Sequence, residues 1–161
     1  MIIVEFANEQ SRLPIDQQRL RSSVQMICAD ALVQNAKISL AVVDDPTIRE
    51  LNRRWLGHDE PTDVLSFGLN AEGSHLEGEI IVSSDMASAS ASRYGWTPHD
   101  ELLLYVIHGA LHLVGYDDQS PERQTQMRER EAHYLVRFDL HPKYDDDQVG
   151  CDDSFTKQEE R

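Results

Sequence analysis

The most informative segment of this sequence is ELLLYVIHGALHLVGYDD, residues 101–118. Its apolar residues recur at three- and four-residue spacing, which is typical of a buried α-helix, and we expect this helix over about residues 100–114. His108 and His112 are four residues apart. Because one helical turn takes about 3.6 residues, both imidazoles project from the same side. Gly115 then ends the helix by adopting a backbone conformation that other residues avoid.

The chain reversal at Gly115 predicts a metal site. It can bring Asp118, or less readily Asp117, back over the two imidazoles. Two neutral imidazoles and one carboxylate form a typical open transition-metal site, and zinc accepts this set while keeping a fourth position for water. The spacing H-x3-H-x2-G-x2-D also matches the zinc frame of metzincin proteases, which carry a third His at the last position. The candidate ligands are therefore His108, His112 and Asp118.

Gly109 narrows the chemistry that such a site can perform. Zinc proteases read HExxH, where the Glu is the general base, but the second position here is Gly109. Peptide hydrolysis therefore lacks its helix-borne base. A metal ion alone can still polarise a phosphoryl oxygen and lower the pKa of bound water. The absence of this base therefore affects phosphate-ester hydrolysis less than peptide hydrolysis. We interpret Gly109 itself as a position of close packing against a neighbouring element.

The rest of the chain alternates short strands with helices. Strands are expected at residues 2–6, 38–43, 63–67 and 79–83, and further helices at about residues 16–32, 44–57, 84–94 and 121–138. Residues 68–78 are expected to form an irregular connection. The predicted class is α/β or α+β, with a single small mixed sheet of about four strands packed with about five helices and the metal on the helical HxxxH.

The length and charge of the chain limit the number of domains and the kinds of binding partner that we expect. The 161 residues suit one domain, and 15 Lys and Arg against 29 Asp and Glu give a net charge of −14. Such a negative charge disfavours electrostatic binding of nucleic acid or anionic lipid over a broad surface. Residues 139–161 carry −5 of this charge, which leaves −9 on residues 1–138. We expect a folded domain over residues 1–140 and an acidic, disordered tail over residues 141–161.

Three further features predict a cytoplasmic protein without a membrane partner. Cys28 and Cys151 are too few for a disulfide framework and indicate free thiols in a reducing compartment. The N-terminal residues 1–6 lack the basic start and long apolar core of a signal peptide. The longest apolar run, residues 102–107, is far too short to span a bilayer.

Three sequence blocks resemble the YbeY family of metal-dependent endoribonucleases. Residues 108–118 resemble its signature HGxLHLxGYDH. The segment DEPTDVLSF, residues 59–67, preceded by Leu51-Asn52 and Gly57, resembles the family's LN…G…D-x-PT-[DN]-VLSF. The segment GEIIVS, residues 78–83, resembles its G-[DE]-I-x-I-S strand. These blocks keep their order and spacing over about residues 38–140.

The resemblance implies a single-domain α/β fold around one zinc ion, held by His108, His112 and Asp118. The implied activity is cleavage of single-stranded RNA in ribosomal RNA maturation, above all at the small-subunit 3′ end, and in ribosome quality control. The implied partners are ribosomal RNA and the small subunit or its proteins. Because the acidic body offers no broad basic groove, we expect weak binding to free RNA and delivery by a partner.

The chain departs from the family pattern at two positions. Asp118 stands where the family normally has the third His ligand, and carboxylate oxygen also binds zinc. The carboxylate makes the metal a weaker Lewis acid and can shift metal selectivity toward Mn or Fe. Leu56 stands where the family usually has an Arg that is thought to contact RNA phosphate, so that role does not carry over.

Other side chains are candidates for contacting substrate. Arg49 and Arg53 share one side of the preceding helix and could grip a phosphate, although pairing with a carboxylate such as Asp45 or Glu50 explains them as well. His58 is either a donor to phosphate or an ordinary loop residue. Ser66 either binds substrate or satisfies a strand edge.

Three other functions stay open on the sequence alone. A metalloprotease would use the same zinc frame, but Gly109 argues against it. A non-haem iron oxygenase also uses two His and one carboxylate, yet such triads usually lie on β-scaffolds. A non-catalytic ribosome-assembly factor, in which metal only braces the fold, is favoured by the changes at Leu56 and Asp118.

Overall fold

The computed structural model describes residues 1–142 of the 161-residue chain. The predicted tail over residues 141–161 therefore lies almost wholly outside the described residues, and the domain division stays a prediction. The elements follow in the order β1 (Ile2–Asn8), α1 (Gln17–Asp30), β2 (Asn35–Val43), α2 (Asp45–Leu56), β3 (Val64–Glu72), β4 (His75–Ser83), α3 (Ser84–Ser90), a 3₁₀ turn (Ala91–Tyr94), α4 (Pro98–Leu113) and α5 (Pro121–Val136). Within residues 1–142, a four-stranded sheet and five α-helices confirm the predicted class.

The sheet is mixed, with the strand order β1-β2-β4-β3. Neighbours β1 and β2, and β2 and β4, run parallel, whereas β3 runs antiparallel to β4. The expectation of an irregular connection at residues 68–78 is wrong, because β3 and β4 extend through this segment as a hairpin. Gly73 supplies the positive φ of +60° that the tight turn needs. Residues 68–72 are exposed and so lack the alternating apolar pattern by which strands are predicted.

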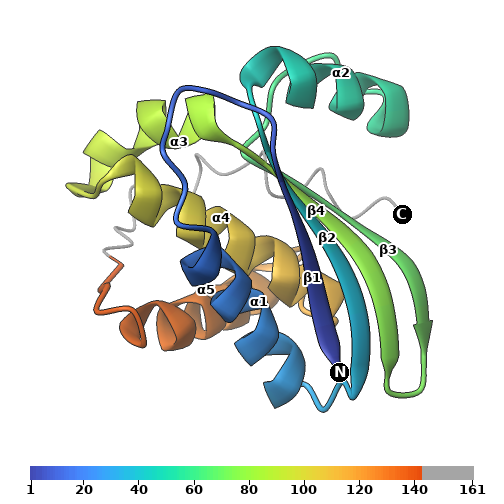
Figure 1. The fold of residues 1–161 in the computed structure, drawn as a ribbon. Helices are drawn as coiled ribbons and strands as arrows, with labels where there is room; N and C mark the ends of the chain where they lie inside the picture. Colours follow the sequence, from blue (N-terminus) through green and yellow to red (C-terminus); the bar gives the residue numbers. More distant parts are fainter. Residues whose placement is uncertain (143–161) are drawn as a thin grey trace.

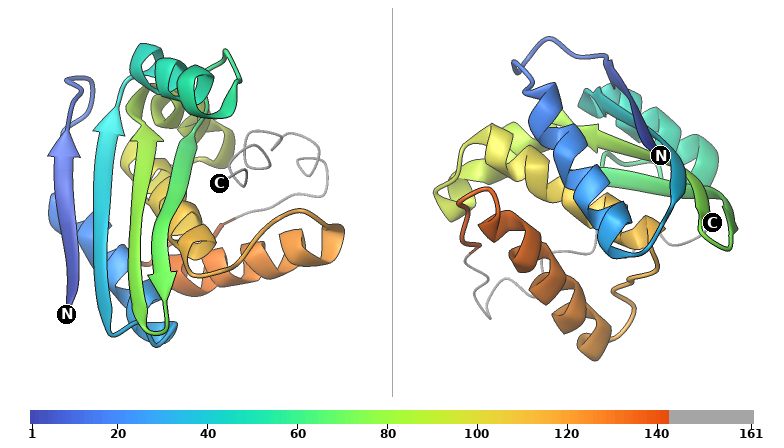
Figure 2. Two further views of the ribbon diagram at one scale, coloured as in Figure 1. Left: turned by 90° about the vertical axis from the view of Figure 1, so that its right-hand side faces the viewer. Right: turned by 60° about the horizontal axis from the view of Figure 1, so that its bottom comes forward.

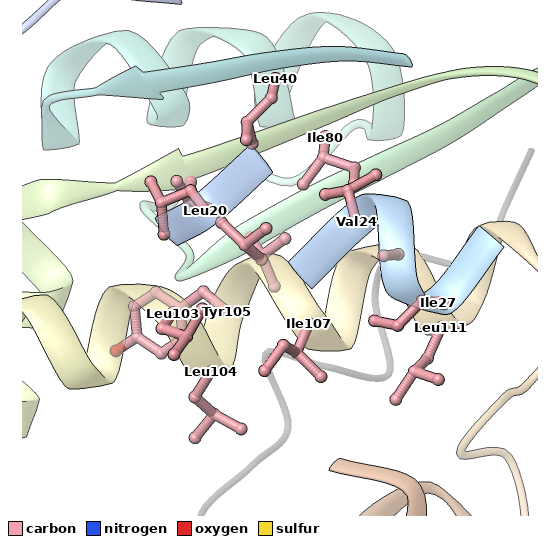
Figure 3. Packing of buried hydrophobic residues seen from close by; sticks show 14 of the residues in the cluster. Leu20, Val24, Ile27, Leu40, Ile80, Leu103, Leu104, Tyr105, Ile107 and Leu111 are labelled. Carbon is pink, nitrogen blue, oxygen red and sulfur yellow. The ribbon is translucent and has the colours of Figure 1, made fainter. Parts of the chain in front are cut away.

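Helices cover the two faces of the sheet unequally (Figures 1 and 2). On one face, α4 packs against β3 and β4 and also contacts α1, α3 and α5. On the other face, α2 covers only one end of the strands, over a small cluster formed by Val43, Ile48, Leu65 and Phe67. The main core lies between the sheet and the α1–α4 pair, where Leu20 and Val24 meet Leu40, Ile80 and the side chains of α4 (Figure 3).

The central helix α4 is defined at its start by a capping box. The Thr97 side chain accepts from the backbone N–H of Asp100, and the Asp100 carboxylate accepts from the N–H of Thr97. All residues from Glu101 to Leu111 are buried, as the apolar sequence predicts. A Cβ atom at Gly109 would lie 2.9 Å from Ile80 Cγ2 and 3.2 Å from Val64 Cγ2, which confirms close packing at this glycine. The helix thus lies almost directly on the sheet.

Every helix within residues 1–142 is too short or too polar to cross a membrane.

Candidate metal centre

The C-terminal half of α4 presents His108 and His112 side by side. Their Nε2 atoms are 2.9 Å apart, and their rings meet edge to face at a centroid distance of 4.5 Å. The helix ends directly afterwards, because Gly115 adopts a φ of +110° that is accessible to glycine. The N–H of Tyr116 then donates to the carbonyl of Leu111, which turns the chain back across the end of α4. This local geometry follows the pattern that the sequence predicts.

The reversal brings Asp118 to the two imidazoles. Asp118 is 5% exposed, and its Oδ2 lies 3.9 Å from His108 Nε2. One donor atom from each of His108, His112 and Asp118 falls within 4.8 Å of the other two. Ligand bonds of about 2.1 Å in a tetrahedral zinc site separate the donor atoms by about 3.4 Å. The observed separations of 2.9 and 3.9 Å bracket that value, so the three residues fit one metal ion.

A fourth residue, Glu131 of α5, completes the hydrogen bonding of His108. Its Oε2 lies 2.6 Å from His108 Nδ1, and the side chains of His108 and Glu131 are only 2% and 6% exposed. A carboxylate accepts hydrogen bonds, so the imidazole proton resides on Nδ1 and Nε2 carries the lone pair. That lone pair faces Nε2 of His112 across 2.9 Å. Either a proton or a metal ion therefore has to lie between these two nitrogens.

Burial keeps both imidazoles neutral. Desolvation lowers the pKa of His108 to about 3. Desolvation also lowers the pKa of His112 to about 3, helped by the neighbouring His108 and opposed by Asp117 and the backbone of Tyr116. A neutral imidazole is the form that binds a metal ion, so the ligand state is present at neutral pH without a proton having to leave.

The structure also separates the two adjacent aspartates. Asp117 accepts from Arg123 Nη1 over 2.7 Å and from the backbone N–H of Gln119 over 3.1 Å. Asp118 instead joins the two imidazoles. Of the two candidates for the carboxylate ligand, the geometry therefore favours Asp118.

Comparison with known proteins identifies the family of this chain. The family described as Endoribonuclease YbeY matches residues 5–139. The chain belongs to the YbeY family. It is 40% identical to the Endoribonuclease YbeY of Chlorobaculum parvum over 124 residues, which cover 77% of this chain and 87% of that protein. It is 44% identical to the Endoribonuclease YbeY of Rhodopirellula baltica over 123 residues, which cover 73% of this chain but 63% of that protein.

A solved structure supports the fold assignment. The solution structure of a Thermotoga maritima protein superposes with a TM-score of 0.58 at 27% sequence identity, covering 83% of this chain and 87% of the other. The overall fold of this chain is thus similar to one already solved in solution.

The substrate-contact candidates of this YbeY chain lie on α2, on β3 and in the loop that joins them. Ser66 is buried on β3, opposite Ile80 in the register, on the face that packs against α4. Arg49 and Arg53 are exposed on α2, where Arg49 Nε donates to Asp59 over 2.9 Å and Arg53 Nη2 donates to Glu50 over 2.6 Å. Pairing of Arg53 with Glu50 is thus observed, whereas Arg49 pairs with Asp59 rather than Asp45.

His58 lies at the start of the loop that joins α2 to β3. It follows Gly57, whose φ of +75° ends α2, and its backbone N–H donates to the carbonyl of Asn52 over 3.3 Å. The side chain of Asn52 is fully buried and donates to the carbonyl of Glu60 over 3.0 Å. The loop is therefore tied back to α2 at two points.

Sequence reasoning missed Glu131. The residue lies on the buried side of α5 with Met127, Tyr134 and Leu135, at helical spacing. A carboxylate among apolar positions was the available signal, because buried charges usually have a specific partner. The identity of that partner was not available, since His108 is 23 residues away along the chain.

Proposed function

We propose that this YbeY chain is a metal-dependent endoribonuclease whose single ion is held by His108, His112 and Asp118. The chain is a hydrolase of RNA phosphodiester bonds by family membership. The observation that carries the metal dependence is the convergence of three donor atoms within 4.8 Å at the buried end of α4.

The side chains define what the site contributes to the reaction. A bound zinc ion would polarise a phosphoryl oxygen and lower the pKa of coordinated water. Three protein ligands leave a position open for water or a phosphate oxygen. With glycine at position 109, α4 supplies no carboxylate beside the histidines to take a proton. The hydrolysis of RNA is less affected by this lack than the hydrolysis of peptides, for which the HExxH base is needed.

Zinc is the proposed resident metal, with Mn or Fe as the alternatives. Two imidazole nitrogens suit zinc, and a carboxylate oxygen in place of a third nitrogen makes the donor set harder. Metal analysis of protein purified without added metal distinguishes the three.

The proposed substrate is single-stranded ribosomal RNA, above all the small-subunit 3′ end during maturation and quality control. Arg49, Arg53, His58 and Ser66 are proposed to contact it. With a net charge of −14, the chain has to rely on local contacts and on delivery by the small subunit or its proteins. A ribosomal substrate implies that the enzyme works in the cytoplasm.

Asp118→Ala tests the proposal directly. Wild type and variant are compared for bound metal and for cleavage of a single-stranded RNA, with circular dichroism as the control for folding. We expect the folded variant to lose both bound metal and cleavage. Full cleavage by metal-free wild type would overturn the proposal. Metal-dependent melting without RNA turnover would point to the non-catalytic assembly factor, and cleavage of casein after zinc addition would point to a protease.

A further inference from the structure

Two polar side chains of α5 contact the proposed ligands from behind. Glu131 Oε2 lies 2.6 Å from His108 Nδ1, and Gln124 Nε2 donates to the backbone carbonyl of Asp118 over 3.1 Å. The two residues are seven positions apart, so they lie two turns apart on the same side of the helix. One helix therefore reaches two ligands that come from different segments of the chain.

Glu131 controls which nitrogen of His108 is available. A carboxylate accepts the proton of Nδ1–H, which leaves the lone pair on Nε2. This is the nitrogen that faces His112 and Asp118. With both partners nearly fully buried, water competes little for the Nδ1–H, so the tautomer and the ring orientation are fixed together.

Gln124 holds the ligand that lies outside regular secondary structure. Asp118 belongs to the segment between α4 and α5, which forms neither helix nor strand. The backbone N–H of Gln124 donates to the carbonyl of Ser120 in the first turn of α5. Its side chain reaches back to Asp118, so the start of α5 closes the preceding loop over the site.

The docking of α5 has anchors apart from these contacts. Met127 and Leu135 are buried in the main core, and the Tyr134 hydroxyl donates to Asp30 of α1 over 2.8 Å. A buried carboxylate adds little to stability compared with an apolar residue of similar size. The specific contribution of Glu131 therefore lies in its hydrogen bond to His108.

We propose that Glu131 and Gln124 are positioning residues of the metal centre. Glu131 fixes the tautomer and orientation of His108, Gln124 fixes the backbone of Asp118, and α5 is thereby part of the site. This inference rests on the proposed function, because it takes His108 and Asp118 to be ligands.

Metal affinity of the full chain is the first readout. Zinc binding is measured by chelator competition for wild type, Glu131→Ala, Glu131→Gln and Gln124→Ala, with Glu129→Ala on the exposed side of α5 as the matched control. Removing a carboxylate partner of a ligating histidine typically weakens metal binding about 10- to 100-fold, and we expect this for Glu131→Ala. Glu131→Gln should recover most of the affinity, because its amide oxygen also accepts Nδ1–H. Gln124→Ala should lose less than Glu131→Ala.

The histidine tautomer is the second readout, measured by ¹⁵N NMR on metal-free protein. We expect His108 of the wild type to carry its proton on Nδ1 and the Glu131→Ala protein to populate both tautomers. If Glu131→Ala matched Glu129→Ala in zinc affinity and in the tautomer of His108, the inference would be overturned. It would also be overturned if Glu131→Ala lowered the melting temperature but left the zinc affinity unchanged. Because the NMR measurement needs no metal, a wild type that takes up no zinc, manganese or iron would overturn the proposed function, while the tautomer of His108 would still test Glu131.

Discussion

Arg123 Nη1 donates to Asp117 Oδ2 over 2.7 Å, at the start of α5. This ion pair directs Asp117 toward the N-terminal turn of α5, while the next residue, Asp118, turns into the protein toward His108. Two identical side chains that are adjacent in sequence thus have different surroundings. Only one of them is buried with the imidazoles.

Neutralising each aspartate separately should distinguish their roles. Asp118→Asn is expected to lose most of its bound metal and its RNA cleavage, because the anionic oxygen donor is gone. Asp117→Asn is expected to stay loaded and active, since it weakens contacts with Arg123 and with the backbone N–H of Gln119, neither of which is a proposed ligand. The measurement is metal content after dialysis, together with RNA cleavage. Equal metal loss in both variants would contradict the assignment of Asp118 as the ligand.

Gly109→Ala should destabilise the fold. The added methyl group would lie 2.9 Å from Ile80 Cγ2, closer than real Cβ contacts allow. Overpacking of this kind costs about 1–3 kcal/mol, and alanine's better helix propensity offsets up to about 1 kcal/mol. We therefore expect a net loss of about 1–2 kcal/mol in urea unfolding. Gly68→Ala, with nothing within 4 Å of its Cβ position, is the control and should change stability less. A more stable Gly109→Ala protein would refute the close contact.

The metal-free protein should lose stability in acid. The folded-state pKa values of His108 and His112 are about 3, below the value of 6.5 for an unperturbed imidazole. The unfolded chain therefore binds more protons than the folded one as pH falls from about 6.5 toward 3, and stability falls with it. Urea unfolding of metal-free wild type between pH 7.5 and 5 should show a steeper loss than unfolding of His112→Gln, which lacks one of these groups. Parallel pH profiles would show that burial does not keep His112 neutral.

Arg49 and Arg53 should affect substrate binding without affecting the fold. Both guanidinium groups are exposed and pair with exposed carboxylates, so their removal should leave the melting temperature nearly unchanged. As phosphate contacts, Arg49→Ala and Arg53→Ala should raise KM for RNA, leave kcat intact and reduce the salt dependence of binding. Lys37→Ala removes another exposed, paired cation and is the control. An unchanged KM in both arginine variants would contradict a role in substrate binding. Arg49 and Arg53 would then only form ion pairs on the surface.

Local patterns in the sequence were enough to predict the helices and to suggest three candidate donor residues. The four-residue spacing of His108 and His112 and the break at Gly115 act within a few residues, where helical geometry is fixed by the backbone. In the structure Asp44 and Ser120 cap α2 and α5, and such caps also act over a few residues. The hairpin at residues 68–78 was missed because its outer strand is exposed and is held by backbone pairing with β4, which leaves no apolar alternation to read.

The amino-acid pattern alone was enough to predict the class of fold, the α4 helix with its two histidines, and a trailing aspartate beside them. The tertiary structure added the different surroundings of Asp117 and Asp118, the pairing of Glu131 with His108, and the side chains that pack against Gly109. These outcomes depend on contacts between segments that are far apart in the chain, such as the 23 residues between His108 and Glu131. Such contacts form only when the helices dock and exclude water, and no local periodicity encodes which partner a buried charge will meet.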